Sequence, residues 1–201
     1  MIREKKIIIQ EKPDWVSWDE IKQCLHEAHA LNREKGINMA RYQRPSEEIK
    51  KFVGDKGTVL VALDGKKVVG TATVMERCKK AWYVQGRYAY LGLAGVVPAY
   101  NGMGIYRDLT LKREEIANRM GIRCLVFDTH NHNTHIQEMA QKNGYRYVAY
   151  THPNNHYNVV MAKWLDGCPY SSCYCMLRFY WSVLKVKAYI NLSGFKHKVF
   201  R

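Results

Sequence analysis

The stretch "VVPAYNGMGIYRDL", residues 96–109, passes from an apolar run to an amphipathic run through two glycines. The apolar run ends at Pro98, the glycines are Gly102 and Gly104, and Ile105 begins a helical pattern. Glycines let the backbone approach a ligand closely, and a helix start presents free N–H groups that favour phosphate. The stretch therefore predicts a strand, a bare loop and a helix that can receive a phosphorylated ligand.

Two common phosphate-binding loops are excluded by the residues that follow the second glycine. A P-loop requires Lys and then Ser or Thr, and the chain has Ile105 and Tyr106. A dinucleotide-binding loop requires a third glycine where the chain has Arg107. A tight strand-to-helix turn that binds nothing remains an open alternative.

The remaining sequence predicts alternating strands and helices, a mixed α/β (α+β) class. The helix at 17–36 has capping-box spacing at Ser17 and Glu20, and a hairpin turns at Asp64-Gly65. Strands are expected at 5–12, 58–76 (the hairpin), 87–97, 123–128, 145–150 and 157–164. Further helices are expected at 46–54, with Ser46 as cap, at 104–121, and at 133–144, with Asn133 as cap.

Composition indicates a globular chain with an affinity for anions. The 201 residues are 47% hydrophobic and carry a formal net charge of +14, which attracts nucleotides, nucleic acids or acidic lipid surfaces. The N-terminal apolar run is too short for a signal peptide, and no apolar run is long enough to span a membrane. The six cysteines are irregularly spaced. We therefore expect a cytoplasmic protein with reduced thiols.

Two segments together resemble the GNAT superfamily of acyl-CoA N-acyltransferases. "VVPAYNGMGIY" resembles its V-x-P-x-Y-R-G-x-G-I-G/A motif, and "NTHIQEMAQKNGYR" resembles its second motif, N-x-x-A-x-x-L-Y-x-K-x-G-F. The residues that match the second motif are Asn133, Lys142, Gly144 and Tyr145. The resemblance implies a central twisted mixed sheet with splayed parallel strands flanked by helices over residues 1–164, followed by an extension at 165–201.

The resemblance also implies acetyl-CoA as acyl donor and a set of residues that bind it. Backbone at Ala94 and Val96 would pair with pantetheine. The pyrophosphate would lie on Asn101, Gly102, Met103, Gly104, Ile105 and Tyr106, and Asn133 belongs to the second motif. Three positions depart from the family pattern: Asn101 replaces Arg or Gln, Tyr106 replaces a small residue, and Ala140 replaces the tyrosine that often donates a proton.

Attack of an amine on a thioester does not require that tyrosine, because a thiolate is a tolerable leaving group and a general acid is helpful rather than obligatory. "DTHNHN", which we expect at the end of strand 123–128, offers Asp128 and His130 as replacements, followed by Tyr88 and Tyr90. Two alternatives remain open: that this segment is an exposed loop, and that it holds a metal. No metal site is expected, because the spacing matches no recognised pattern. A metal in this segment would have as its potential ligands Asp128, His130, His132 and His135.

The function that these observations favour is transfer of an acetyl group to a primary amine of a small molecule or amino sugar. The alternatives are a macromolecular acceptor, such as aminoacyl-tRNA or a protein amine, and a degenerate acyl-CoA-binding module. Nucleic acid, a membrane surface and a homodimer are the possible macromolecular partners.

Residues 165–201 carry six basic residues and one acid. Their pattern predicts an amphipathic helix at 174–190 with one narrow polar stripe, Arg178, Ser182 and Lys185. We expect it to dock on the acyltransferase domain, on a partner subunit or on an anionic membrane, with protein docking favoured because few basic residues face outward.

Overall fold

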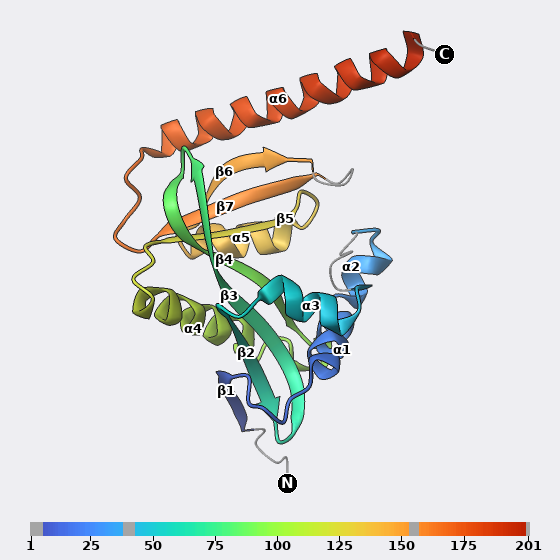
Figure 1. Cartoon of the computed structure of the whole chain (residues 1–201), viewed down its shortest axis with the longest axis vertical. Coiled ribbons are helices and arrows are strands. Elements are labelled where there is room, and N and C mark those ends of the chain that lie inside the picture. Colours follow the sequence, from blue (N-terminus) through green and yellow to red (C-terminus); the bar gives the residue numbers. More distant parts are fainter. Residues whose placement is uncertain (1–5, 38–42, 153–156, 200–201) are drawn as a thin grey trace. The chain divides into compact units, whose positions relative to one another are not determined.

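The computed structural model describes residues 6–37, 43–152 and 157–199 (Figure 1). It divides into two compact units, one ending at Leu125 and the other beginning at Val126. Helices and strands alternate along both units, which confirms the mixed α/β class.

In the first unit, the predicted helix at 17–36 is interrupted. Helix α1 (Trp18–Ala28) begins at the predicted capping box, in which Ser17 Oγ accepts from the Glu20 N–H at 3.2 Å. The Glu20 carboxylate accepts from the Ser17 N–H at 2.7 Å in return. The helix ends at His29, and a separate α2 follows (Ala30–Glu34). The third helix, α3 (Ser46–Val53), includes Ser46 as its first residue, so the prediction that Ser46 caps it is wrong.

Four antiparallel strands form the sheet of this unit in the order β1 (Ile7–Glu11), β2 (Gly57–Asp64), β3 (Lys67–Ala81) and β4 (Val84–Val96). The predicted hairpin is confirmed: Asp64 pairs with Lys67, and Gly65 takes a left-handed φ of 60° in the turn. Strands β3 and β4 extend well past the predicted ends, and they pair along this extension.

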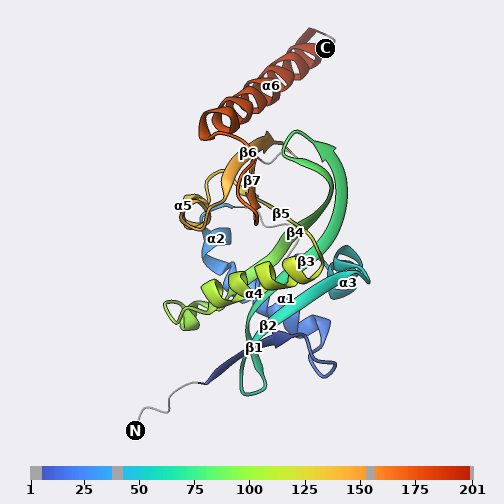
Figure 2. The same cartoon turned by 90° about the vertical axis from the view of Figure 1, so that its left-hand side faces the viewer.

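Helices cover both faces of this sheet. A Cβ at Gly70 of β3 would contact Ile105 and Leu109 of α4 (Ile105–Arg119), whereas one at Gly95 of β4 would contact Ala28 of α1. Gly95 pairs with Thr71, the next residue after Gly70, and successive residues of a strand point to opposite faces. Helices α4 and α1 therefore pack on opposite faces of the sheet, and Figure 2 views the unit from the α4 side.

The second unit places β6 (Arg146–Thr151) and β7 (Asn158–Trp164) in an antiparallel hairpin, with β7 between β6 and β5 (Cys124–His130). Strand β5 continues two residues past its predicted end, so Thr129 and His130 lie in the strand, together with Asp128, rather than after it. Helix α5 (Thr134–Lys142) follows, and the long α6 (Ser172–Val199) runs along β6 (Figure 1).

Candidate functional site

The glycine loop has the geometry that the sequence predicts. Pro98–Tyr100 form a single 3₁₀ turn after β4, and the Asn101 N–H donates to the Pro98 carbonyl at 3.0 Å. Gly102 and Gly104 have φ of 80° and 77°, a left-handed backbone that side-chain-bearing residues rarely adopt. A Cβ at Gly102 would meet no atom within 4 Å, so the loop is open on that side.

The start of α4 faces this open loop with unpaired amides. Gly104 is the N-cap and provides no side-chain cap, and the first-turn N–H groups of a helix have no acceptor within the helix. The helix dipole adds partial positive charge at the same place. Left-handed glycines, open space and free amides together fit a phosphate group.

Sequence reasoning missed a cation at this loop, Arg107. Its guanidinium lies 3.5 Å from the position that a Cβ on Gly104 would take, and its Nε is 3.0 Å from the Asp108 carboxylate. A basic residue in the first turn opposes the helix dipole, which is the signal that could have singled it out. Arg107 therefore places a positive charge beside a loop whose motif arginine is replaced by Asn101.

Tyr106, the other departure in the loop motif, packs along α4. Its backbone carbonyl accepts from Thr110 Oγ1 at 2.8 Å, and Thr110 Oγ1 in turn accepts from Arg113 at 3.0 Å. The Arg113 guanidinium also lies 5.9 Å from the Tyr106 ring centroid. These contacts hold the Tyr106 ring beside the helix.

Strand β4 contains a β-bulge immediately before the loop. Thr71 pairs with Gly95 and Thr73 with Gly92, so two residues of β4, Leu93 and Ala94, oppose one residue of β3. Among the described residues, Leu93 is the one non-glycine with positive φ, at 43°. Such strain persists only where the surroundings enforce it, and it concentrates at functional sites.

His29, at the break between α1 and α2, holds this bulge. It is only 8% exposed, and its Nε2 lies 3.0 Å from the Ala94 carbonyl oxygen. Asn32 Nδ2 donates to His29 Nδ1 at 3.1 Å, so the ring carries its proton on Nε2 and donates it to Ala94. Burial lowers the pKa of His29 to about 4, which keeps the ring neutral at pH 7.

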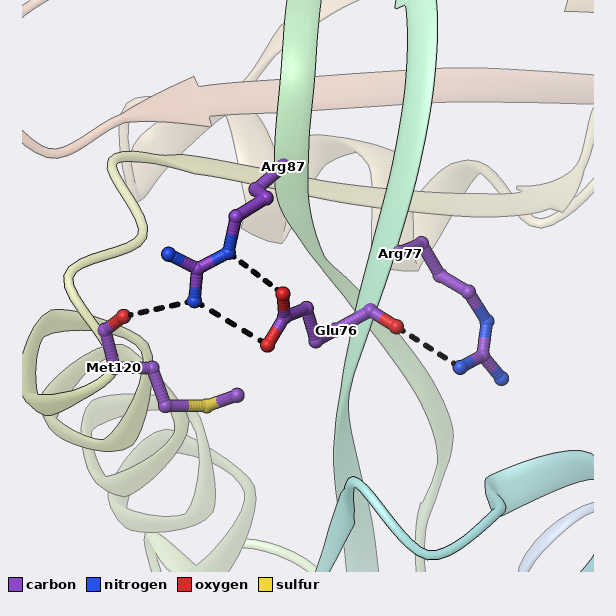
Figure 3. A network of polar contacts seen from close by, with 4 residues as sticks. All are labelled: Glu76, Arg77, Arg87 and Met120. Atoms are coloured by element: carbon purple, nitrogen blue, oxygen red, sulfur yellow. Dashed lines mark hydrogen bonds and ion pairs between the residues drawn. The ribbon is translucent and has the colours of Figure 1, made fainter.

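The outer part of the β3–β4 hairpin is fixed by a polar network around Glu76 (Figure 3). Arg87 Nε donates to Glu76 at 2.6 Å, and Arg87 Nη2 donates to the second Glu76 oxygen at 3.3 Å and to the Met120 carbonyl at 3.2 Å. This hydrogen bond from Arg87 lowers the pKa of Glu76. On the other side of β3, Arg77 donates to the Glu76 carbonyl and to the Phe52 carbonyl of α3. The network ties the hairpin to α4 and α3.

The tyrosines predicted as catalytic candidates lie on this same hairpin. Tyr88 is 9% exposed, and the Lys79 ammonium lies 5.2 Å from its ring centroid and 4.6 Å from that of Tyr83. Tyr90 makes an edge-to-face contact with Phe52 at 6.3 Å. Both candidate tyrosines therefore pack against neighbouring side chains of this unit.

In the second unit, Asp128 and His130 lie two residues apart on β5 and thus on one face of the strand. Asp128 accepts from Asn158 Nδ2 at 2.7 Å. His130 Nδ1 accepts from the His132 N–H at 3.3 Å, and the two imidazole centroids are 5.3 Å apart. Because Nδ1 accepts, the neutral His130 ring carries its proton on Nε2.

Gln137 of α5, which sequence reasoning did not single out, anchors this end of β5. Its amide nitrogen donates to the His130 carbonyl at 3.2 Å and to the Asn131 carbonyl at 2.9 Å. Its oxygen accepts from the Tyr147 hydroxyl at 3.1 Å. A glutamine that is 7% exposed and uses both ends of its amide in this way fixes the backbone that carries His130.

Comparison with known proteins identifies the family. The model of the acetyltransferase (GNAT) family matches residues 18–145, well over half of the sequence. The chain belongs to the GNAT acetyltransferase family. It is therefore an acyl-CoA N-acyltransferase whose acceptor the family match leaves undefined. No curated protein sequence matches the chain significantly.

Solved structures show the GNAT fold along most of the chain. An acetyltransferase from Streptococcus agalactiae superposes with a TM-score of 0.61 at 19% identity, covering 79% of this chain and 98% of its own. An aminoglycoside 6'-N-acetyltransferase complexed with coenzyme A gives 0.58 at 16%, covering 79% and 97%. A GNAT acetyltransferase from Elizabethkingia anophelis with acetyl-CoA bound gives 0.55 at 15%, covering 81% and 100%. At these identities the likeness shows the fold.

In this GNAT chain, the second-motif residues take structural roles within the second unit. Asn133 is the N-cap residue of α5, as predicted, but its side chain makes no capping hydrogen bond; its Nδ2 instead donates to Thr129 Oγ1 at 3.2 Å. Ala140, at the position of the family's frequent tyrosine, is 8% exposed. No hydroxyl is available at position 140.

The metal alternative has no support in the described residues. Within residues 6–37, 43–152 and 157–199, no three His, Cys, Asp or Glu side chains are grouped to hold a metal ion. All six cysteines are free thiols.

Proposed function

We propose that this protein transfers the acetyl group of acetyl-CoA to a primary amine of a small molecule or amino sugar. The observation that carries the proposal is the loop of Gly102 and Gly104. Its left-handed backbone opens toward the uncapped amides of α4, at the position of the first GNAT motif. The GNAT neighbours crystallised with coenzyme A or acetyl-CoA, one of them an aminoglycoside N-acetyltransferase, support the choice of donor and acceptor class.

In this proposal, the donor is held by backbone and by one added cation. The pyrophosphate binds the N–H groups of the loop, whose residues are Asn101, Gly102, Met103, Gly104, Ile105 and Tyr106. Arg107 contributes the charge that Asn101 lacks. Pantetheine pairs with backbone at Ala94 and Val96, on either side of Gly95. Asn133 acts indirectly, because its side chain supports Thr129.

The reaction forms a C–N bond between the amine and the thioester carbonyl and breaks the C–S bond, so that coenzyme A leaves as a thiolate. The amine loses one proton and the thiolate gains one. Holding the two reactants together can supply roughly 7–11 kcal/mol of the barrier reduction. The bulge at Leu93 and Ala94 orients backbone groups that can steady the oxyanion, and His29 is the residue that keeps this bulge in place.

We propose Asp128 and His130 as the groups that move the amine proton, with Tyr88 as the reserve. His130 carries an Nε2–H and a backbone fixed by Gln137, which makes it the better-oriented member of the pair. An imidazole can both accept and donate a proton, which suits this role.

The net charge of +14 favours one further acceptor class, a macromolecular anion such as aminoacyl-tRNA. A protein amine belongs to the same alternative. We propose that residues 1–164 form the acyltransferase domain. We also propose a cytoplasmic location, with which six free thiols agree.

The test is an acceptor screen with the full chain and acetyl-CoA. The panel contains aminoglycosides, polyamines, free amino acids, a lysine peptide and aminoacyl-tRNA, and the product is read by mass spectrometry. We expect an acetylated small amine and formation of coenzyme A in equal amount. Acetylation of aminoacyl-tRNA alone would replace the small-molecule acceptor with the macromolecular one. Failure of every amine, with folded protein, would contradict the proposal.

A further inference from the structure

Helix α6 has two different apolar faces, and one of them is occupied by β6. Phe179 packs on Tyr147 with ring centroids 5.1 Å apart and on Tyr150 at 6.3 Å. Ser182 Oγ accepts from the Tyr150 N–H at 2.7 Å. The predicted polar stripe through Ser182 therefore lies partly on the packed side of the helix.

The opposite face of α6 carries an apolar stripe that no described residue covers. We call Leu177, Tyr180, Trp181 and Leu184 the exposed stripe; their side chains are 67%, 58%, 54% and 59% exposed. Leu177, Trp181 and Leu184 follow one another at i, i+4 and i+7, so they form a continuous line along the helix. Contiguous apolar surface of this kind marks a binding site more often than scattered apolar residues do.

The charge around the exposed stripe has one sign. Over 167–190, where the side chains are described, the charged residues are Arg178, Lys185 and Lys187, with no Asp or Glu. Lys185 and Lys187 are exposed, and helical spacing puts them on the two sides of the stripe. The Lys185 ammonium lies 5.6 Å from the Trp181 ring centroid. Lysines that flank an apolar line can extend their charge outward while their stems cover apolar surface.

We propose that the exposed stripe binds the surface of an anionic lipid membrane, with α6 lying in the plane of the headgroups. Trp and Tyr place an apolar ring below the headgroups and a polar group among them, and the flanking lysines meet the lipid phosphates. A second copy of the chain fits less well, because two such helices would bring lysines together without a carboxylate to pair them. Over the described residues, no helix is long and apolar enough to cross a membrane.

The first experiment is flotation of the full chain with vesicles of phosphatidylcholine alone and with about a third phosphatidylglycerol. The wild-type chain is expected to float with the anionic vesicles and much less with the neutral ones. The double variant Trp181→Ser, Leu184→Ser is expected to lose this association. The matched control is Leu111→Ser on α4, which removes a leucine that is 58% exposed and lies outside the stripe; it should float like wild type.

A second pair of variants tests the charge. Lys185→Gln with Lys187→Gln should weaken binding to anionic vesicles by about fivefold for each lysine. Lys35→Gln with Lys66→Gln, which removes two exposed lysines elsewhere, should leave binding unchanged. All variants are checked for wild-type circular dichroism.

Three results would overturn the proposal. One is that the wild-type chain fails to float with anionic vesicles. Another is that the stripe variant floats as well as the Leu111→Ser control. The third, measured by sedimentation velocity, is a stable dimer that Leu184→Ser dissociates, because a second copy would then occupy the stripe.

Discussion

His29 Nε2 donates a hydrogen bond to the Ala94 carbonyl at 3.0 Å, and this bond joins a break in a helix to a bulge in a strand. The bulge bears the strained Leu93, and Gly95 beside it has no room for a side chain, because a Cβ there would lie 2.7 Å from the Ala28 Cβ. The helix end and the bulge are therefore fitted to each other. We propose that His29 acts on the reaction through Ala94, as a positioning residue.

Two substitutions of His29 should distinguish the loss of its hydrogen bond from the loss of its side-chain volume. His29→Leu removes the donor to the part-buried Ala94 carbonyl, at a cost of about 1 kcal/mol in the free energy of unfolding. We expect kcat to fall about tenfold with a smaller change in the KM for acetyl-CoA. His29→Gln keeps an amide N–H near the Nε2 position and should recover most of kcat. Leu and Gln variants of equal kcat, measured well below their unfolding temperatures, would show that the bond does not matter to catalysis.

The buried His29 should also make stability depend on pH. Burial lowers its pKa to about 4, while in the unfolded chain it titrates near 6.5. As the pH falls from 7 toward 4, the unfolded chain takes up a proton that the native state does not, so stability is lost and the loss levels off below the native pKa. The lost stability should reach about 2 kcal/mol at pH 5. The free energy of unfolding in urea should fall between pH 7 and pH 5, and this fall should be about 2 kcal/mol smaller in His29→Gln than in the wild-type chain. An equal fall in the two proteins would refute the buried neutral state.

Adjacent residues on α6 should respond very differently to truncation. Phe179→Ala removes a ring packed on Tyr147 and Tyr150, and we expect about 2–3 kcal/mol of destabilisation. Tyr180→Ala, on the exposed side of the helix, should change stability by less than about 0.5 kcal/mol. Equal effects in chemical denaturation would show that α6 is not docked on β6.

The proton-transfer proposal is tested at Asp128 and His130 separately. Asp128→Asn and His130→Gln keep the size of each side chain and remove its acid–base function. At least one should lower kcat by about 10²-fold and flatten one limb of its pH profile. If both retain the wild-type rate and profile, Tyr88→Phe becomes the variant to measure.

Local signals in the sequence predicted local structure well. The Ser17–Glu20 capping box, the turn at Gly65 and the glycine loop before α4 all depend on residues close in the chain, and all are confirmed. The end of α1 could not be predicted in this way, because His29 bonds with a carbonyl 65 residues away. The bulge in β4 likewise has no local signature beyond its flanking glycines, Gly92 and Gly95.

Errors arose where a local rule competed with a tertiary contact. Asn133 takes the predicted N-cap position of α5, yet its amide bonds to Thr129 rather than to the helix. Ser182 has the residue type of a solvent-facing stripe, yet it bonds to the backbone of β6. Arg107 was missed because the family motif directs attention to position 101. For Asn133 and Ser182, the partner of the side chain belongs to another element.

The central claim, that the loop at 101–106 binds acyl-CoA phosphates, is tested most directly at Met103. Substitutions at Gly102 or Gly104 would strain a left-handed backbone, whereas Met103 is 45% exposed and does not have a positive φ. Met103→Glu and Met103→Gln have nearly the same shape and differ by one negative charge. Isothermal titration calorimetry with coenzyme A should show binding by the wild-type and Gln proteins and at least about tenfold weaker binding by the Glu protein. Equal affinities for the Glu and Gln variants, or no binding by the wild-type chain, would contradict the account.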